Sequence, residues 1–172
     1  MGKPLLYVDV DGVLNPVFPH PDEDFDSHTL LGYSVLLSPR HGEWLHELAD
    51  RYDLVWATTW EYEANRYIAP LLGLPELPVV KFSGYVAQPG DPRVPLMELF
   101  SAFKWAPLLR YAQGRPFAWI DDCIPSRLVR RSLLRPDRLL MPIDPAQGLR
   151  REHVDRLLRR PPAQSWLNRR TG

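Results

Sequence analysis

The sequence predicts an α/β fold in which a largely parallel sheet is covered by helices on both faces. Three observations support this prediction. Short apolar runs typical of buried strands recur along the 172-residue chain. Segments with apolar residues at helical spacing separate these runs. Polar residues suited to chemistry directly follow several of the apolar runs, and ligand sites of open parallel sheets lie at the carboxyl ends of the strands.

Five segments are predicted to form strands, so we expect a sheet of about five strands. The first apolar run ends in turn residues around Asp11 and Gly12, and the others have similar boundaries. The predicted strands are residues 5–10, 53–57, 79–82, 117–120 and 139–141.

Helices are predicted between these strands. Ser38 and Pro39 favour a helix start, and an apolar stripe follows at helical spacing, formed by Trp44, Leu45, Leu48 and Tyr52. Gly73 and Pro75 are expected to end a helix over residues 61–72. The remaining helices are expected at residues 104–112, from residue 126, and at 149–158.

The whole chain, residues 1–172, is expected to form a single domain, because its length suits one core. Residues 14–38 are rich in Pro and Asp and are interpreted as a flap or loop insertion, with a hairpin near residues 31–37. Residues 145–172 are expected to form a C-terminal helix and a basic tail.

Composition favours a cytoplasmic protein that does not enter membranes. The chain is 45% hydrophobic and 24% charged, and its one cysteine, Cys123, fits a reducing compartment. The apolar run before Asp9 is too short for a signal peptide or a membrane span. Residues 127–172 carry twelve arginines and four acids, a net charge of +8, which the rest of the chain balances. A polyanionic partner and a general Arg/Pro-rich composition both explain this asymmetry.

Asp9 and Asp11 form the most informative pattern. They follow a buried strand, one residue apart, and Gly12 permits a tight exit from that strand. One carboxylate can attack phosphorus as a nucleophile, and the other can move a proton to the leaving oxygen and later from water. Asp and Gly are also common turn residues, so a simple turn is the alternative.

Other strand ends add groups that suit phosphate and metal. Thr58 follows the second strand and can donate to a phosphoryl oxygen. Asp121 and Asp122 follow the fourth strand, and such acids suit a hard cation like Mg²⁺. Lys104, expected at a helix start, can neutralise a phosphoryl group, and Lys81 is the rival candidate for that role.

In the order of these motifs, the sequence resembles the haloacid dehalogenase (HAD) superfamily over roughly residues 5–122. The resembling residues are Asp9-Val10-Asp11-Gly12-Val13, Thr58, Lys104 and Asp121-Asp122. The resemblance implies a Rossmann-like three-layer sandwich and a phosphatase with Mg²⁺ as its cofactor.

The resemblance also implies roles for the residues. Asp9 is implied to attack phosphorus, Asp11 to handle protons, and Thr58 and Lys104 to hold the phosphoryl oxygens. Metal binding is implied for Asp9, Asp11 and Asp121, with Asp122 in support. Thr59 and Trp60 stand where many members have glycine followed by Arg or Gly, and they are expected to contact substrate.

Two alternatives compete with a phosphatase. A response-regulator receiver domain also uses clustered acids, a Thr and a Lys, but its acidic pair comes first in the chain and its Lys comes last. The second alternative is a non-catalytic protein on a HAD scaffold that binds nucleic acid through the basic C-terminal region.

The gaps between motifs predict a capless enzyme with an open site. Residues 14–38 are too few for a separate folded cap, and most of the gap after Thr59 is needed for the main sheet. The site is expected to be flanked by Phe18, His20, Tyr33 and Trp60. Such a site suits a large phosphorylated substrate, a nucleic-acid end or a phosphoprotein, unless another chain or the flap closes it.

Overall fold

The computed structural model describes residues 2–18, 24–82 and 96–163, and side chains are described throughout except in residues 96–102. Four strands form the main sheet in the order β4-β1-β5-β6, and every neighbouring pair is parallel. Their bounds are Leu5–Val8 for β1, Asp53–Trp56 for β4, Phe117–Asp121 for β5 and Arg138–Pro142 for β6. The α/β class predicted from the sequence is confirmed.

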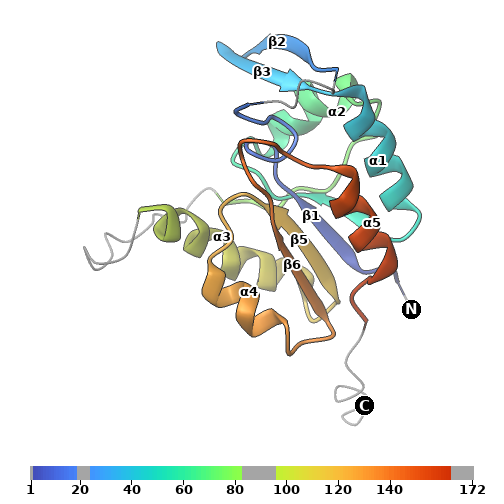
Figure 1. Ribbon diagram of the computed structural model, residues 1–172, viewed down its shortest axis with the longest axis vertical. Coiled ribbons are helices and arrows are strands. Elements are labelled where there is room, and N and C mark those ends of the chain that lie inside the picture. Colours follow the sequence, from blue (N-terminus) through green and yellow to red (C-terminus); the bar gives the residue numbers. More distant parts are fainter. Residues whose placement is uncertain (1, 19–23, 83–95, 164–172) are drawn as a thin grey trace.

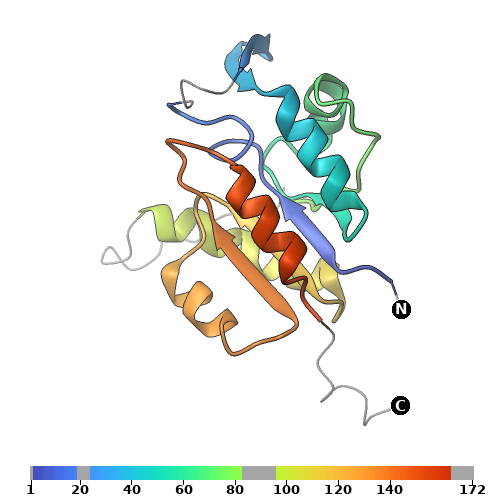
Figure 2. The ribbon, with the colours of Figure 1, turned by 45° about the vertical axis from the view of Figure 1, so that its right-hand side comes forward.

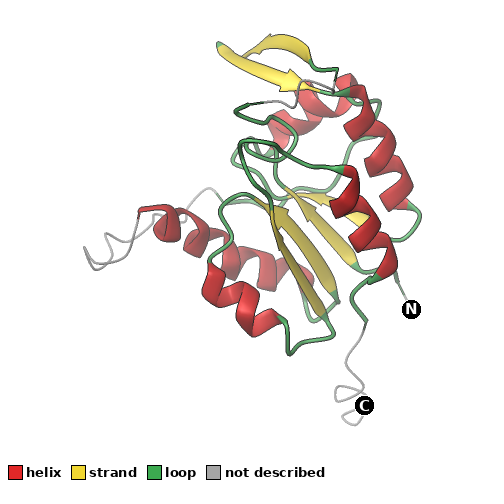
Figure 3. Ribbon diagram, viewed as in Figure 1, coloured by secondary structure: helices red, strands yellow, loops and turns green. Residues whose placement is uncertain are grey.

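Helices cover both faces of this sheet and give three layers (Figures 1 and 3). The helices are α1 (Pro39–Ala49), α2 (Ala69–Leu71), α3 (Leu96–Ala112), α4 (Ser126–Ser132) and α5 (Arg151–Arg159). A π-helical segment, Ala64–Ile68, runs directly into α2. Turning the molecule shows α5 crossing in front of the sheet, with α4 to its lower left (Figure 2).

Alternation along β1 divides its side chains between two cores. Leu6 and Val8 pack with residues of α1, the π-helical segment and α5 in the larger core. Leu5 and Tyr7 face the opposite way and pack with Leu108 of α3 and with other residues of the second core. Residues that continue this alternation past the strand end therefore point alternately toward the two helical layers.

The prediction of a strand at residues 79–82 is wrong. Only a single parallel bridge joins Val79 to Trp56, with hydrogen bonds on either side of it. Pro78 has no N–H to donate, and the Phe82 N–H donates instead to Glu61 Oε1 at 2.7 Å. The ladder therefore cannot extend along β4.

Two helices differ from their predicted form. Helix α3 begins at Leu96, so Lys104 lies in the helix interior and not at its start, and Pro107 is accommodated inside the helix. Within the segment predicted as one α-helix over residues 61–72, the five residues Ala64–Ile68 are π-helical. There the Ala69 N–H bonds to the Ala64 carbonyl, just before Pro70, which has no N–H of its own.

The insertion between β1 and α1 contains an antiparallel hairpin formed by β2 (Asp26–Leu30) and β3 (Tyr33–Leu37). Figures 1 and 2 show it beyond the end of the sheet where the strands finish. Leu31 and Gly32 make its tight turn, both with positive φ. Among the described residues, no helix has both the length and the apolar character needed to cross a membrane.

A buried histidine joins α1 to the loop before α5. The ring of His41 is fully buried, and its Nε2 lies 3.2 Å from the carbonyl oxygen of Leu149. A carbonyl only accepts hydrogen bonds, so Nε2 carries the proton. Burial lowers the pKa of His41 to about 4, because the charged ring would lose its hydration.

This lowered pKa predicts a loss of stability in acid. Between pH 6.5 and pH 4 the unfolded chain binds a proton at His41 that the folded chain does not. The stabilisation is therefore complete above pH 6.5 and is lost as pH falls, by about 3 kcal/mol across the window. Urea unfolding of the wild type and His41→Gln at pH 7 and pH 4 measures this difference. Parallel pH dependences of the two proteins would contradict it.

Candidate active site

The candidate site lies at the carboxyl ends of β4, β1 and β5, which are neighbours in the sheet. Val8 is in register with both Trp56 and Ile120. Asp9 and Asp121 therefore occupy equivalent levels on adjacent strands, and Thr58 follows two residues after the end of β4. The parallel register is what brings together residues more than a hundred positions apart.

Lys104 joins the two strand-end carboxylates. Its Nζ lies 2.6 Å from Asp9 Oδ2 and 2.6 Å from Asp121 Oδ2. All three side chains are at most 7% exposed. Asp9 follows Tyr7 in the strand alternation, so it points toward the layer that contains α3, and Lys104 reaches it from that helix. A buried charged group with so little contact with water is stable only when an opposite charge pairs with it in this way.

The local charges shift the acid–base properties of these groups. Burial and repulsion by Asp121 raise the pKa of Asp9, although Lys104 opposes both effects. Burial lowers the pKa of Lys104, but attraction to Asp9 and Asp121 outweighs it, and the pKa of Lys104 is raised. Lys104 is therefore a permanent cation at neutral pH.

Asp121 is held by two further donors. The Cys123 backbone N–H donates to Asp121 Oδ1 at 2.8 Å, and the Trp119 indole N–H donates to Asp121 Oδ2 at 3.2 Å. Asp122 is partly buried, and burial raises its pKa. Burial also raises the pKa of the Cys123 thiol to about 12, so this thiol stays protonated at neutral pH.

A tight turn after β1 separates Asp11 from Asp9. The Val10 carbonyl accepts hydrogen bonds from the N–H groups of Val13, Leu14 and Asn15 at 2.8–3.2 Å. Gly12 has a φ of 71°, and a Cβ there would lie 2.6 Å from the Asp122 carboxylate. Glycine is required at this position for both reasons. The turn brings the Asp9 and Asp122 segments close together.

Asp11 is exposed, and both of its carboxylate oxygens are held. Asn15 Nδ2 donates to Oδ1 at 3.0 Å, and Trp60 Nε1 donates to Oδ2 at 2.9 Å. Asn15 also accepts, through its Oδ1, the backbone N–H of Leu36 on β3 at 2.9 Å. The side chain of Asn15 therefore connects Asp11 with the hairpin.

The turn after β4 carries Thr58, Thr59 and Trp60. Thr58 is fully buried, and its hydroxyl accepts the backbone N–H of Trp60 at 3.3 Å. Glu61 follows with a φ of 46°, an uncommon conformation for a residue with a side chain. This local arrangement turns the chain so that the Trp60 indole reaches Asp11.

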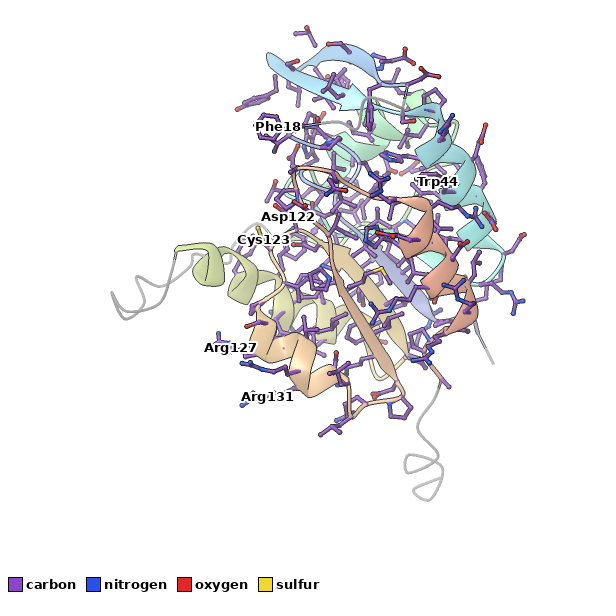
Figure 4. All side chains as sticks on the ribbon, viewed as in Figure 1. Phe18, Trp44, Asp122, Cys123, Arg127 and Arg131 are labelled. Carbon is purple, nitrogen blue, oxygen red and sulfur yellow. The ribbon has the colours of Figure 1, made fainter. Side chains whose placement is uncertain are left out.

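A cavity of about 560 Å³ lies between this turn and the hairpin. The side of the cavity near β1 is lined by Asp11 and Asn15, and the side near β4 is lined by Thr59, Trp60 and Glu63. Residues of the hairpin line the third side. Of the residues predicted to flank the site, Tyr33 lines this cavity and is 68% exposed. Phe18 is 73% exposed and lies on the hairpin side of Asp122 in Figure 4. His20 lies outside the described residues.

The two candidate lysines occupy different environments. Lys104 lies between Asp9 and Asp121, as described above. The Lys81 ammonium instead lies over the ring of Tyr62, 5.3 Å from its centroid, and Lys81 is exposed. The geometry favours Lys104 over Lys81 as the lysine of the candidate site.

Sequence reasoning missed two side chains that shape this site. Trp119 holds Asp121 through its indole N–H, but its place within an apolar strand marks it only as a core residue. Asn15 holds Asp11 from four residues away. An amide that close to an aspartate in a turn is a recognisable signal, because Asn side chains often bond nearby groups in turns.

The residues present fit a divalent cation. Asp9, Asp121 and Asp122 together bring three carboxylates against the one ammonium of Lys104, which leaves two negative charges when all are ionised. Ligand atoms of Asp121, Asp122 and Cys123 lie within 4.8 Å of one another. The protonated Cys123 thiol is a poor ligand for Mg²⁺, whereas carboxylate oxygens are its usual protein ligands. The donor set therefore consists of the carboxylates.

Comparison with known proteins supports the resemblance seen in the sequence. A family model described as the HAD domain in Swiss Army Knife RNA repair proteins matches residues 5–154. No match was found among curated proteins or among solved structures. The matched region includes the whole main sheet and the candidate site. The chain therefore belongs to this family of HAD domains, within a superfamily of hydrolases and phosphatases.

Proposed function

We propose that this protein is a Mg²⁺-dependent phosphohydrolase that removes a terminal phosphate from RNA through an aspartyl-phosphate on Asp9. The observation that carries the proposal is the buried Lys104 bridge between Asp9 and Asp121 at adjacent strand ends. The ionised carboxylate of Asp9 is the form that can attack phosphorus, and the ammonium of Lys104 favours that form by opposing the effects of burial and of Asp121. The family description supports RNA as the substrate class.

In the first step, an oxygen of Asp9 forms a bond to phosphorus while the bond to the ester oxygen breaks. Asp11 gives its proton to the departing oxygen, which leaves as an alcohol. The Asp11 carboxylate is held by Asn15 and Trp60, so it is oriented before substrate arrives. Thr58 and Lys104 contribute a hydroxyl and a positive charge to the phosphoryl oxygens.

In the second step, water attacks the aspartyl-phosphate and Asp11 takes a proton from that water. The products are inorganic phosphate and the regenerated Asp9 carboxylate. When bound to the site carboxylates Asp9, Asp121 and Asp122, Mg²⁺ supplies positive charge that stabilises the transferring phosphoryl group. Asp11 would contribute through its backbone carbonyl.

Positive charge on α4 supports a nucleic-acid substrate. Helix α4 starts five residues after Asp121 and presents the exposed Arg127, Arg130 and Arg131. In Figure 4, Arg127 and Arg131 extend outward from α4. Arginines contact backbone phosphates without regard to sequence, so this helix offers a path for the strand whose end enters the site.

Replacing the nucleophile should abolish turnover. Asp9→Asn has nearly the same volume, but an amide is a poor nucleophile, so kcat should fall by about 10³-fold or more. The assay measures phosphate release from a phosphorylated RNA oligonucleotide and from an aryl phosphate. Circular dichroism checks that the variant is folded. Near-normal turnover in folded Asp9→Asn would contradict the covalent mechanism.

Replacing the proton donor should affect substrates unequally. Asp11→Asn should retain much of the phosphoryl transfer from an aryl phosphate, whose leaving group needs no proton, but little from an alkyl phosphate. Hydrolysis of the aspartyl-phosphate should also slow, so the intermediate should accumulate and be trapped by acid quenching. Equal losses with both ester types, without accumulation, would exclude this role for Asp11.

Removing the metal should abolish activity reversibly. Chelator-treated protein should be inactive and should recover on addition of Mg²⁺. Asp121→Ala should raise the Mg²⁺ concentration needed for half-maximal activity and weaken Mg²⁺ binding measured by calorimetry. Asp144→Ala, which changes an acid in the loop after β6, is the matched control. Full activity of metal-free protein would refute the proposed cofactor.

A further inference from the structure

The cavity beside Asp11 has a charge that restricts what it binds. Asp11 and Glu63 are its charged lining residues within the described part of the chain. Arg66 lies just beyond, with Nη1 3.9 Å from Glu63 Oε2, but its side chain is 71% exposed. A second phosphate in this cavity would face two carboxylates at close range, which is unfavourable. The cavity therefore suits a group that carries no negative charge.

Its walls suit a flat group in particular. The exposed ring of Tyr33 and the apolar side chains of Leu31 and Val35 form the hairpin side. The Trp60 ring lies on the other side, fixed in place by its hydrogen bond to Asp11. Aromatic side chains on a rigid frame are the usual platforms on which nucleobases stack.

A buried hydrogen-bond acceptor in the cavity further restricts which ligands fit. Glu63 Oε2 is buried although the side chain as a whole is 44% exposed, and it accepts no hydrogen bond from the described residues. A buried oxygen without a donor is costly, so it favours a ligand that brings an N–H group. Nucleobases present N–H donors at the edge of a flat uncharged ring.

We infer that this cavity binds the nucleobase of the terminal nucleotide whose phosphate reacts at Asp9. Tyr33 stacks on the base, and Glu63 accepts a hydrogen bond from its N–H edge. Asp11 lines the cavity and protonates the leaving oxygen in the proposed reaction, so the departing nucleoside lies on the side of the site where the cavity opens. This inference rests on the proposed function and specifies its leaving group.

The first test compares leaving groups. Adenosine and guanosine monophosphates, phosphorylated at the 5′ or the 3′ oxygen, are assayed against ribose 5-phosphate and a phosphoserine peptide. The wild type should prefer at least one nucleotide series over ribose 5-phosphate by about tenfold or more in kcat/KM, which is the range expected for stacking of one base. Equal rates, or preference for the peptide, would overturn the inference.

Variants of Tyr33 test whether the cavity causes the preference for nucleotides over ribose 5-phosphate. Tyr33→Ala should reduce the ratio of nucleotide to ribose 5-phosphate kcat/KM toward one, and Tyr33→Phe should retain it because the ring remains. Tyr62→Ala is the matched control, since Tyr62 is also an exposed tyrosine but does not line the cavity. An unchanged ratio in folded Tyr33→Ala would overturn the assignment.

A binding measurement separates this inference from the proposed function. Adenosine and guanosine, which carry no phosphate, are titrated calorimetrically into Asp9→Asn and into Asp9→Asn/Tyr33→Ala. Binding that Tyr33→Ala weakens about tenfold supports the nucleobase site even if the wild type hydrolyses no ester. Hydrolysis of ribose 5-phosphate without nucleoside binding leaves the phosphatase proposal intact and refutes the nucleobase site.

Discussion

One ion pair network determines how this site is built. Asp9 and Asp121 lie at the ends of adjacent strands, buried and close enough to share the ammonium group of Lys104. Two like charges in a poorly hydrated environment repel strongly, and the cation between them reduces this repulsion. Lys104 reaches them from α3, which packs on the sheet through Leu108 and Ala112. The placement of α3 therefore decides whether a cation lies between the two strand ends.

The Asp11 side chain is held by different interactions from those of Asp9. It is exposed to solvent and takes no part in the lysine network, but Asn15 and Trp60 fix both of its oxygens. Burial raises the pKa of Asp9, whereas hydrogen bonds fix the orientation of the Asp11 carboxylate. The turn at Gly12 makes this division possible, because it moves the chain from the buried strand end to the edge of the cavity within two residues.

The sequence predicted the fold class, the four strands of the sheet and the side chains at their ends, because these depend on local apolar runs and on the geometry of parallel sheets. It failed where hydrogen bonding depends on distant partners. Phe82 bonds to a glutamate twenty-one residues earlier and so leaves the sheet. Lys104 was placed at a helix start, although α3 extends eight residues further toward the N-terminus. The bond from Trp60 to Asp11 spans forty-nine residues, and local patterns do not reveal such contacts.

The two hydrogen bonds of Asn15 limit which sequence changes the hairpin can tolerate. Its amide joins the Leu36 N–H of the hairpin to the Asp11 carboxylate. A shift of β3 by one residue would present a different backbone group to Asn15 and release its hold on Asp11. Variation in the hairpin that preserves its register, such as exchange of the exposed Leu31 or Tyr33, leaves this connection in place. New specificities should therefore arise through side chains at the tip of the hairpin rather than through changes in its length.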